Sequence, residues 1–487
     1  LYRHSMKKKY VRWTLWTIAS PFILFIILCI LIYLPPIQNF LVDKAAVYAS
    51  EATGMNISVG RISLSFPLNL VVTNVDAASP HNDTLLSVRR LQVNVQLLPL
   101  LKKQVEVDGI SLQGATVNSN DLIHGMKLNG TLGELFISSH GVALDPETAI
   151  VNKVLLKDTD LSLCLNDTAA ADTAASDTAY WKIILQDIDL QNVSFALDMP
   201  LDSLSLAASL DNAILRDGLI DLHKSAYSLQ TFRIENGRVR YDNGKPLAAD
   251  SLSSGLDPSH IALTDIGVKL DSLYYGGRNM KAIISQFVLK ERSGVEIVSA
   301  TGRMVSNDKV LRVPSLKLET RDSYLELNAA MDWNALDFKD EGLVSARLMA
   351  DIGKPDVVRF MGSMDEKFIR QYPSEPLRIR TGIDGDLNKL KLTTLTAELP
   401  GALGLFARGE LTHLTDSLLR GGDITLEAET KDLKFVSTLA EGIEIPYGTR
   451  LEGKFTMAGT KMGTDLLLMQ PEAQAVVAAD TIPITVY

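Results

Sequence analysis

Cysteine is nearly absent from this chain of 487 residues, which holds only Cys29 and Cys164. Cys29 lies inside a long apolar run, so the two cannot sensibly pair, and no disulfide framework stabilises the fold. Aromatic residues are also few, at 6%, which leaves few rings to stack on bases or sugars. Because 58 acidic residues outnumber 48 basic ones, we expect no nucleic-acid partner.

Recognisable catalytic and metal-binding motifs are missing as well. The seven histidines are scattered without metal-ligand spacing, and the chain has no G-x-S-x-G elbow, P-loop or G-x-G-x-x-G after a strand. Asp158/Asp160 and Asp187/Asp189 are close pairs, but charges on the outer face of a strand explain them more simply. A carbohydrate enzyme needs only two carboxylates placed by the fold. We nevertheless predict a protein that is not an enzyme and binds no metal or cofactor.

What the chain does contain is a charge-free apolar run over residues 13–34. At about 1.5 Å per residue, a helix of roughly 22 residues matches a hydrocarbon core of about 30 Å. Basic residues crowd residues 1–12 before it, which places the N-terminus in the cytoplasm. A cleaved signal peptide is the alternative, but the apolar core is long and no A-x-A-like site follows closely. The aromatic residues of this expected anchor are Trp13, Trp16, Phe22, Phe25 and Tyr33.

A second helical pattern covers residues 35–54, after Pro35 and Pro36 stop the first helix. Its apolar residues lie near one stripe, and Gly54 stands where a C-cap is expected. The segment is either an amphipathic helix beside the membrane or a plug at the end of the following sheet, and the two are compatible.

From Met55 onward the apolar period changes from 3.6 to 2, which indicates strands with one apolar face. The alternation slips by one residue at Gly60-Arg61 and again at Arg89-Arg90, so we expect a turn or bulge at both places. Many strand candidates are separated by tight-turn pairs such as Asp108-Gly109 and Asn236-Gly237. The pattern predicts strands that pair sequentially in a meander.

Residues 166–180 form a low-complexity stretch of Asp, Thr and Ala, which we interpret as a solvated loop rather than a calcium loop. The last third of the chain repeats. Asp356 and Asp432 lie 76 positions apart, each after a strand and each opening a helical pattern, near residues 357–369 and 433–439. The order of elements predicts a stacked array of units of about 75–80 residues.

The one-sided strands raise a physical question, because only those two short helical patterns could cover their apolar face. Either the sheet folds on itself as a sandwich or β-helix and fills its own interior, or an open, curved sheet offers its apolar trough to the acyl chains of a ligand. Periodicity alone does not choose between them.

A resemblance enters at the start of the β region. Residues 53–75 (TGMNISVGRISLSFPLNLVVTNV), 83–88, 91–101 and 105–117 closely resemble the start of the AsmA/TamB-like family, in which an inner-membrane anchor and a helix ending in Thr-Gly precede strands of this pattern. The close match covers residues 13–120. The resemblance implies a mainly β fold: an N-terminal transmembrane helix, then an elongated, curved, mostly antiparallel β-groove of repeats with a few short helices.

The resemblance also implies a function. Such a protein is anchored in the bacterial inner membrane as a single-pass protein with its bulk in the periplasm. It carries phospholipid along a hydrophobic groove toward the outer membrane. An outer-membrane assembly β-barrel is then a partner. Family members of the TamB branch are usually much longer, so this chain is either an N-terminal portion or a shorter AsmA-type member. The expected groove-lining residues are Ile62, Leu64, Phe66, Leu91, Val93, Val95, Ile110 and Leu112.

A different function remains open: a structural or assembly scaffold whose edge strand near Tyr487 adds to a partner barrel by β-augmentation. The expected organisation is the same for both functions. It comprises a basic tail (1–12), the anchor (13–34), the amphipathic helix (35–54), an AsmA/TamB-like β segment (55–165), the low-complexity loop (166–180), a continuation of the β-groove (181–300) and β repeats with short helices (301–487).

Overall fold

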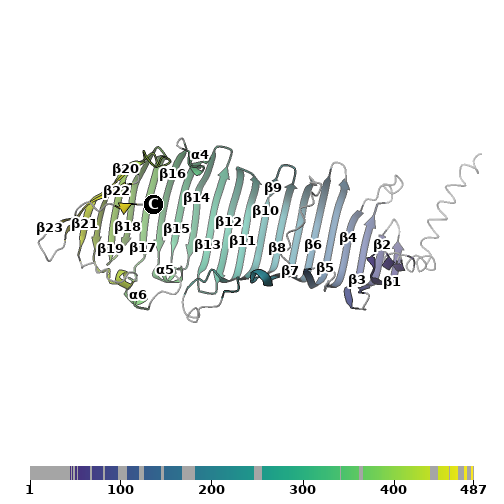
Figure 1. The fold of residues 1–487 in the computed structure, drawn as a ribbon. Helices are drawn as coiled ribbons and strands as arrows, with labels where there is room; N and C mark the ends of the chain where they lie inside the picture. The colour runs from purple at the N-terminus through teal and green to yellow at the C-terminus, as the bar shows by residue number, and fades with distance from the viewer. Residues whose placement is uncertain are drawn as a thin grey trace, which may run out of the picture. The chain divides into compact units, whose positions relative to one another are not determined.

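A computed structural model gives the fold, which is mainly β (Figure 1). The structure describes residues 44, 46–47, 50–51, 53–65, 69–79, 83–96, 107–119, 125–143, 147–166, 181–245, 255–339, 342–360, 366–438, 448–459, 461–469, 476–479 and 484–485. The mainly β fold with a few short helices, predicted from the period of two, is confirmed. Phe66, the anchor over residues 13–34 and the loop over residues 167–180 lie outside the described residues.

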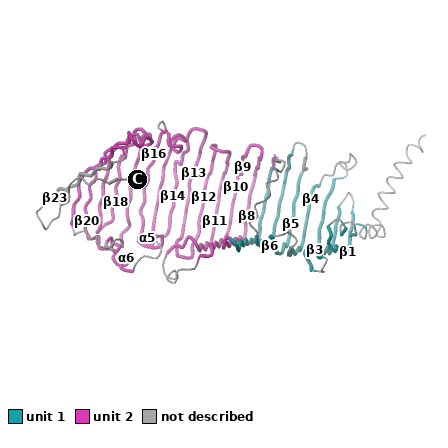
Figure 2. The backbone as a smooth tube through the Cα atoms, viewed as in Figure 1, with its two compact units in different colours: residues 1–176, 183–201 teal, residues 177–182, 202–487 magenta. Residues whose placement is uncertain are grey.

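The chain divides into two compact units, coloured separately in Figure 2. Unit 1 comprises residues 1–176 and 183–201. Its strands are β1 (Asn56–Ser65), β2 (Asn69–Ala78), β3 (Thr84–Val95), β4 (Val107–Asn118), β5 (Met126–Ala143), β6 (Thr148–Leu165) and β7 (Lys182–Met199). From β1 to β6, each strand pairs antiparallel with the next one in the chain.

Unit 2 comprises residues 177–182 and 202–487 and continues the same sequential pattern. Its strands are β8 (Leu204–Asp221), β9 (Ala226–Leu229), β10 (Thr231–Asp242), β11 (His260–Gly276), β12 (Asn279–Glu291), β13 (Glu296–Ser306), β14 (Val310–Thr320), β15 (Tyr324–Asp332), β16 (Leu343–Ile352), β17 (Leu377–Asp386), β18 (Lys389–Leu399), β19 (Leu403–Thr412), β20 (Gly421–Thr430), β21 (Arg450–Ala458), β22 (Lys461–Met469), β23 (Val476–Ala479) and β24 (Ile484–Thr485). Strands β9 and β10 both lie between β8 and β11, and β23 and β24 both pair with β22. The predicted meander is confirmed within each unit.

The predicted slips in alternation are present in unit 1. On β1 the exposed positions change phase at Gly60 and Arg61, which are both exposed. On β3 Arg89 and Arg90 are both exposed, and the pairing of β2 with β3 skips Asn74 and Arg89. The irregular positions face each other across neighbouring strands, because the pairing of β1 with β2 skips Gly60 and Asn74. Asn74 takes a left-handed backbone (φ 53°) that Asn tolerates better than most residues. A slip of one residue keeps the apolar side chains of both strand halves on one face.

Gly54 behaves as the sequence predicts. Its φ is +69°, and its N–H donates to the carbonyl of Ser50 at 2.9 Å, which ends the helical turn before β1. The Ser50 hydroxyl then accepts a hydrogen bond from the backbone N–H of Ile57 at 3.0 Å. This contact attaches the preceding helical turn to the edge strand.

The short helices of unit 2 differ in part from the prediction. One helical pattern near residues 357–369 is two helices, α5 (Lys354–Phe360) and α6 (Glu366–Gln371). Of the pattern near residues 433–439, the structure describes residues 433–438, and there it has the 3₁₀ helix η2 (Val436–Thr438) rather than an α-helix. A further helix, α4 (Trp333–Leu336), has no counterpart in the prediction, because four residues are too few for a helical period to show. The 3₁₀ helix η1 (Pro200–Asp202) precedes β8.

The repeat predicted in the last third is visible in the order of elements. Strands β14, β15 and β16, then α5 and α6, then β17, are followed by β18, β19 and β20, then η2, then β21. The ends are packed differently in the two copies. In the first, Asp356 of α5 is hydrogen-bonded at the turn after β14. In the second, the turn after β18 and the segment after β20 pack against α6 of the first copy, with Phe368, Tyr372 and Phe435 at the centre. The repeat therefore preserves strand order rather than side-chain identity.

Two glycines of β19 test how closely the strands approach. A Cβ on Gly409 would lie 2.1 Å from the carbonyl oxygen of Asp423 on β20, whereas a Cβ on Gly404 would meet nothing within 4 Å. We expect Gly409→Ala to weaken the β19–β20 pairing by about 2–3 kcal/mol, because the backbone must move. Amide hydrogen exchange of β19 and β20 measures this, with Gly404→Ala as the matched control. Equal protection in the two variants would contradict the strand spacing.

Candidate functional site: the apolar rows

Apolar residues of unit 1 stand in register across five strand pairs. Two cross-strand rows result, which we call the Leu112 row and the Ile110 row. The Leu112 row is Ile62, Val72, Leu91, Leu112, Leu135 and Leu156, and the Ile110 row is Leu64, Leu70, Val93, Ile110, Ile137 and Val154. Since residues two apart on a strand share a face, both rows lie on one face, which we call the apolar face of unit 1. Every member is half-buried.

Six of the eight predicted groove residues fall in these two rows. Val95 lies on β3 two positions after Val93, beyond a register shift, and it is half-buried. Phe66 lies outside the described residues. Val72, Leu70 and all the members from β5 and β6 were missed. The alternation of apolar residues on β2 was enough to identify Leu70 and Val72. The members on β5 and β6 could be found only from the strand register, which the sequence does not show.

Unit 2 carries two longer rows of the same kind. The Leu327 row runs from β8 to β21 as Leu215, Phe232, Leu270, Ile284, Gly302, Leu316, Leu327, Leu348, Thr381, Leu395, Ala407, Leu426 and Gly453. The Leu325 row runs from β13 to β21 as Ala300, Leu318, Leu325, Ala350, Ile379, Ala397, Leu405, Ala428 and Leu451. Thr381 is the one hydroxyl in either row, and neither row contains a charged residue.

The opposite face of these unit 2 strands is polar. Ion pairs join Arg380 to Asp351 at 2.8 Å and Lys389 to Glu410 at 3.0 Å, and Lys454 lies 3.1 Å from Asp423. Such exposed pairs contribute little stability each. They do show which face meets water.

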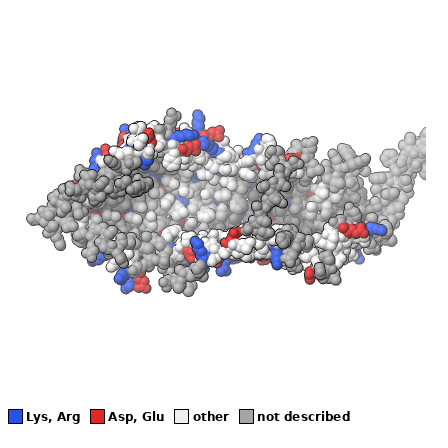
Figure 3. All heavy atoms as spheres, viewed as in Figure 1, with Lys and Arg blue, Asp and Glu red and all other residues white. Residues whose placement is uncertain are grey.

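The residues that the structure describes cover the apolar face of unit 2 only in part. The large side chains of its rows are half-buried, and the members that are fully buried are small: Ala300, Ala350, Ala407 and Ala428. The described helices pack at the ends of the strands, where α4 rests on Val344 and Leu387 and α6 on Leu399. Figure 3 shows a hollowed, mostly uncharged face over β10–β16, with blue and red spheres gathered along its two edges.

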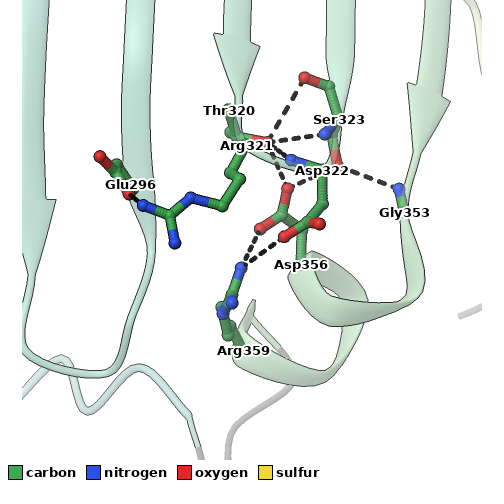
Figure 4. A network of polar contacts seen from close by, with 8 residues as sticks. All are labelled: Glu296, Thr320, Arg321, Asp322, Ser323, Gly353, Asp356 and Arg359. Carbon is green, nitrogen blue, oxygen red and sulfur yellow. Dashed lines mark hydrogen bonds and ion pairs between the residues drawn. The ribbon is translucent and has the colours of Figure 1, made fainter.

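A polar cluster fixes α5 at one edge of unit 2, as Figure 4 shows. Asp356 of α5 is 1% exposed, and its carboxylate accepts hydrogen bonds from the hydroxyls of Thr320 and Ser323, the latter at 2.6 Å. Arg359 lies 3.1 Å from Asp356 and 2.8 Å from Asp322, so the buried carboxylate is paired. The Ser323 hydroxyl also accepts from the N–H of Gly353 at 3.0 Å. Because these groups satisfy one another, the geometry supports a structural role.

A second polar contact lies close by at the start of β11. The Nδ1 of His260 donates to Asp257 at 2.8 Å, and its Nε2 lies 3.6 Å from Asp242. The hydrogen bond from His260, together with that from the Ser259 backbone, lowers the pKa of the Asp257 carboxyl below its usual value of 3.8. The N–H of Leu256 donates to the carbonyl of Arg359 at 2.7 Å, which joins this loop to α5.

The carboxylates of the two pairs weighed in the sequence each have a partner in the structure. Asp158 accepts from the Asn192 side chain at 2.9 Å, and Asp160 accepts from the Ser194 hydroxyl at 2.6 Å. Asp187 and Asp189 also have partners. Within the part of the chain that the structure describes, no group of three His, Cys, Asp or Glu side chains is placed to hold a metal ion.

Comparison with known proteins adds no assignment: no family model matches the chain, and neither a curated protein nor a solved structure matches it. The resemblance to the AsmA/TamB-like family therefore stays a prediction. In the described residues, no helix combines the length and apolar character that a bilayer crossing requires. The predicted anchor residues Trp13, Trp16, Phe22, Phe25 and Tyr33 are not among them.

Replacing the buried carboxylate should release α5. We expect Asp356→Ala to cost about 3 kcal/mol of local stability, since it removes the acceptor for two hydroxyls and one arginine. Faster amide exchange in α5 and in the Thr320–Ser323 turn measures the loss. The matched control is Glu366→Ala on α6, whose exposed pair with Arg370 should be worth under about 0.5 kcal/mol. Unchanged exchange in the Asp356→Ala chain would contradict a clamping role.

The His260 contact predicts a dependence on pH. A carboxyl whose pKa is lowered by folding stabilises the fold above its usual pKa of 3.8, and this contribution is lost as pH falls through the lower, folded value. The turn at Asp257–His260 should therefore open first on acidification below about pH 4. Amide exchange of Ser259 and His260 measured from neutral to acidic pH would show it. Asp257→Asn should remove this dependence, and an identical profile in that variant would contradict the assignment.

Proposed function

We propose that the apolar faces bind the acyl chains of phospholipid and that the protein is a membrane-anchored, non-enzymatic lipid carrier of the bacterial cell envelope. The observation that supports this most directly is the set of uncharged rows, in register from β1 to β6 in unit 1 and from β8 through β10 and β11 to β21 in unit 2. Their large members stay half-buried, without a covering layer among the described elements.

The energetics favour an amphiphile as the occupant. Each buried CH₂ is worth about 0.8 kcal/mol, so a lipid tail gains on the order of 10 kcal/mol by leaving water for such a face. A row that repeats from strand to strand offers similar surroundings at neighbouring positions. A tail could then shift along the row at little net cost, which suits transfer more than tight storage.

The proposed setting follows the resemblance. The chain would be held in the inner membrane by residues 13–34, with its strands in the periplasm, and would carry phospholipid along a curved groove toward the outer membrane. An outer-membrane assembly barrel would be the partner at the far end. The predicted β-augmentation near Tyr487 has no observation to favour it, because residues 486–487 lie outside the described part of the chain.

Photocrosslinking in living cells tests lipid occupancy with the full chain. A photoreactive phenylalanine replaces Leu112 or Leu348 on the apolar faces. Its matched controls replace Gln113 or Met349, the next residue along each strand, whose side chain lies on the other face. We expect phospholipid adducts, identified by mass spectrometry, at the first pair of positions and at least tenfold fewer at the second. Equal yields on the two faces, or none at either, would refute the proposal.

A charge placed on the apolar face should reduce the amount of lipid that the protein binds. Leu348→Glu places a carboxylate where a tail would lie, so we expect about tenfold less lipid bound, equivalent to about 1.4 kcal/mol. Met349→Glu on the opposite face should leave lipid content unchanged. Lipid is quantified after extraction of the purified full chain, and thermal unfolding of both variants controls for misfolding.

A further inference from the structure

Two connections at one edge of unit 2 carry large apolar side chains out into solvent. The first follows β15 and contains α4, and the second joins β19 to β20 (Figure 1). Some other connections at this edge are tight polar turns, such as the one after β13 at Asn307 and the one after β17 at Asn388, while the turn after β8 exposes the single leucine Leu222. We call the exposed residues the apolar edge: Leu336 (41% exposed), Phe338 (77%), Leu343 (59%), Leu418 (82%) and Leu419 (64%).

The backbone holds Phe338 in place at a conformational cost. The N–H of Phe338 donates to the carbonyl of Ala335, and that of Lys339 donates to the carbonyl of Asn334 at 2.7 Å. This is the Schellman arrangement, in which the residue at Phe338 is usually glycine because it must be left-handed. Phe338 has a φ of +56°. Glycine would be easier to accommodate, and yet the chain places an exposed aromatic ring there.

The second connection is equally well ordered. The carboxylate of Asp416 accepts hydrogen bonds from the N–H groups of Leu418 at 2.8 Å and Leu419 at 3.2 Å, and its carbonyl accepts from Arg420 at 2.9 Å. The turn therefore presents both leucines outward instead of folding them onto the sheet.

One small core supports both connections. Ala335 of α4 packs with Val344 and Leu387, and Leu414 of the second connection packs against the same cluster. Beside it, the Arg278 guanidinium lies 5.3 Å from the ring centre of Trp333 and 2.9 Å from Asp337. An arginine over a tryptophan next to exposed Phe and Leu is the chemistry of a bilayer interface, where rings and long cationic side chains sit at headgroup depth.

The exposed area points to a bilayer rather than a protein. At about 200 Å² for a whole side chain, the exposed fractions leave on the order of 600 Å² of apolar surface. A stable protein interface takes about 800 Å² per partner in one complementary patch, whereas this surface is smaller and divided between two loops. Insertion of single side chains between lipid headgroups needs no matching shape.

We propose that the apolar edge docks on the surface of a phospholipid bilayer, with Phe338, Leu418 and Leu419 inserted at headgroup depth. This contact is separate from the apolar rows and does not require that they carry lipid. It gives unit 2 a membrane contact of its own, independent of residues 13–34.

Quenching by lipid tests the contact. The full chain, with Cys29→Ser and Cys164→Ser, is reconstituted into vesicles of phosphatidylethanolamine and phosphatidylglycerol and labelled with an environment-sensitive dye at Leu418→Cys. Protein-free vesicles of the same composition, containing brominated lipid, are then added. We expect at least fivefold stronger quenching than for a label at Asp308→Cys, on the neighbouring β13–β14 turn. Equal quenching at the two positions, or capture of a protein with no response to vesicles, overturns the proposal.

Phe338→Gly separates membrane contact from folding. Glycine suits the left-handed position, so the thermal midpoint should stay the same or rise, while quenching at position 418 falls at least threefold. Undiminished quenching in this variant overturns the proposal. The photocrosslinking at Leu112 and Leu348 is a separate measurement. If no lipid is crosslinked there while quenching at position 418 persists, the carrier function is contradicted and the membrane contact is not.

Discussion

The fold depends on keeping the large aliphatic side chains of successive strands on one face. Side chains alternate across a strand, so a shift of one residue would turn a whole strand's apolar set toward water. The chain satisfies this constraint in two ways. The strand register aligns Leu91 with Leu112 and Leu135. The irregular positions of neighbouring strands also face each other, as at Gly60 and Asn74. In unit 1, where the alternation slips on β1 it also slips on β2, and the same holds for β2 and β3.

That alignment explains why the surface forms rows rather than scattered patches. In unit 1 every row member is a large aliphatic residue, from Ile62 to Leu156. From β16 to β21 in unit 2 the rows alternate large with small, as at Leu348, Thr381 and Leu395. Three of the four alanines among them, Ala350, Ala407 and Ala428, are buried, although the described helices pack at the strand ends. Large neighbours close over small ones where side chains converge, as they do on the inner face of a curved sheet. The two stretches therefore differ in surface: one is uniformly large and aliphatic, and the other alternates large with small.

Much of this could be predicted from the sequence, and the reasons are local. Alternation over residues 55–72, with its change of phase at Gly60-Arg61, and alternation over residues 91–97 are visible in the sequence, and they contain four of the six predicted residues that the structure sets in two rows. The strand register cannot be predicted in this way, because no pattern within β4 or β5 shows that Leu135 pairs with Leu112. Short elements are also hard to identify from hydrophobic periodicity, because α4 has only four residues and η2 has three. The buried hydrogen bond between Asp356 and Thr320 joins residues 36 positions apart, and hydrophobic periodicity cannot predict such a contact.

The edges of unit 2 explain how an uncovered apolar face can persist in a folded protein. A bare sheet invites self-association through its face and its unpaired margins, and helices usually cover it. Here the helices are placed at the strand ends, with α5 held by a buried carboxylate and α4 by a small apolar core. Using those helices to cap the ends leaves the centre of the face accessible. An accessible apolar centre bounded by charged margins fits a molecule that has an apolar part and a polar head, and a phospholipid has both.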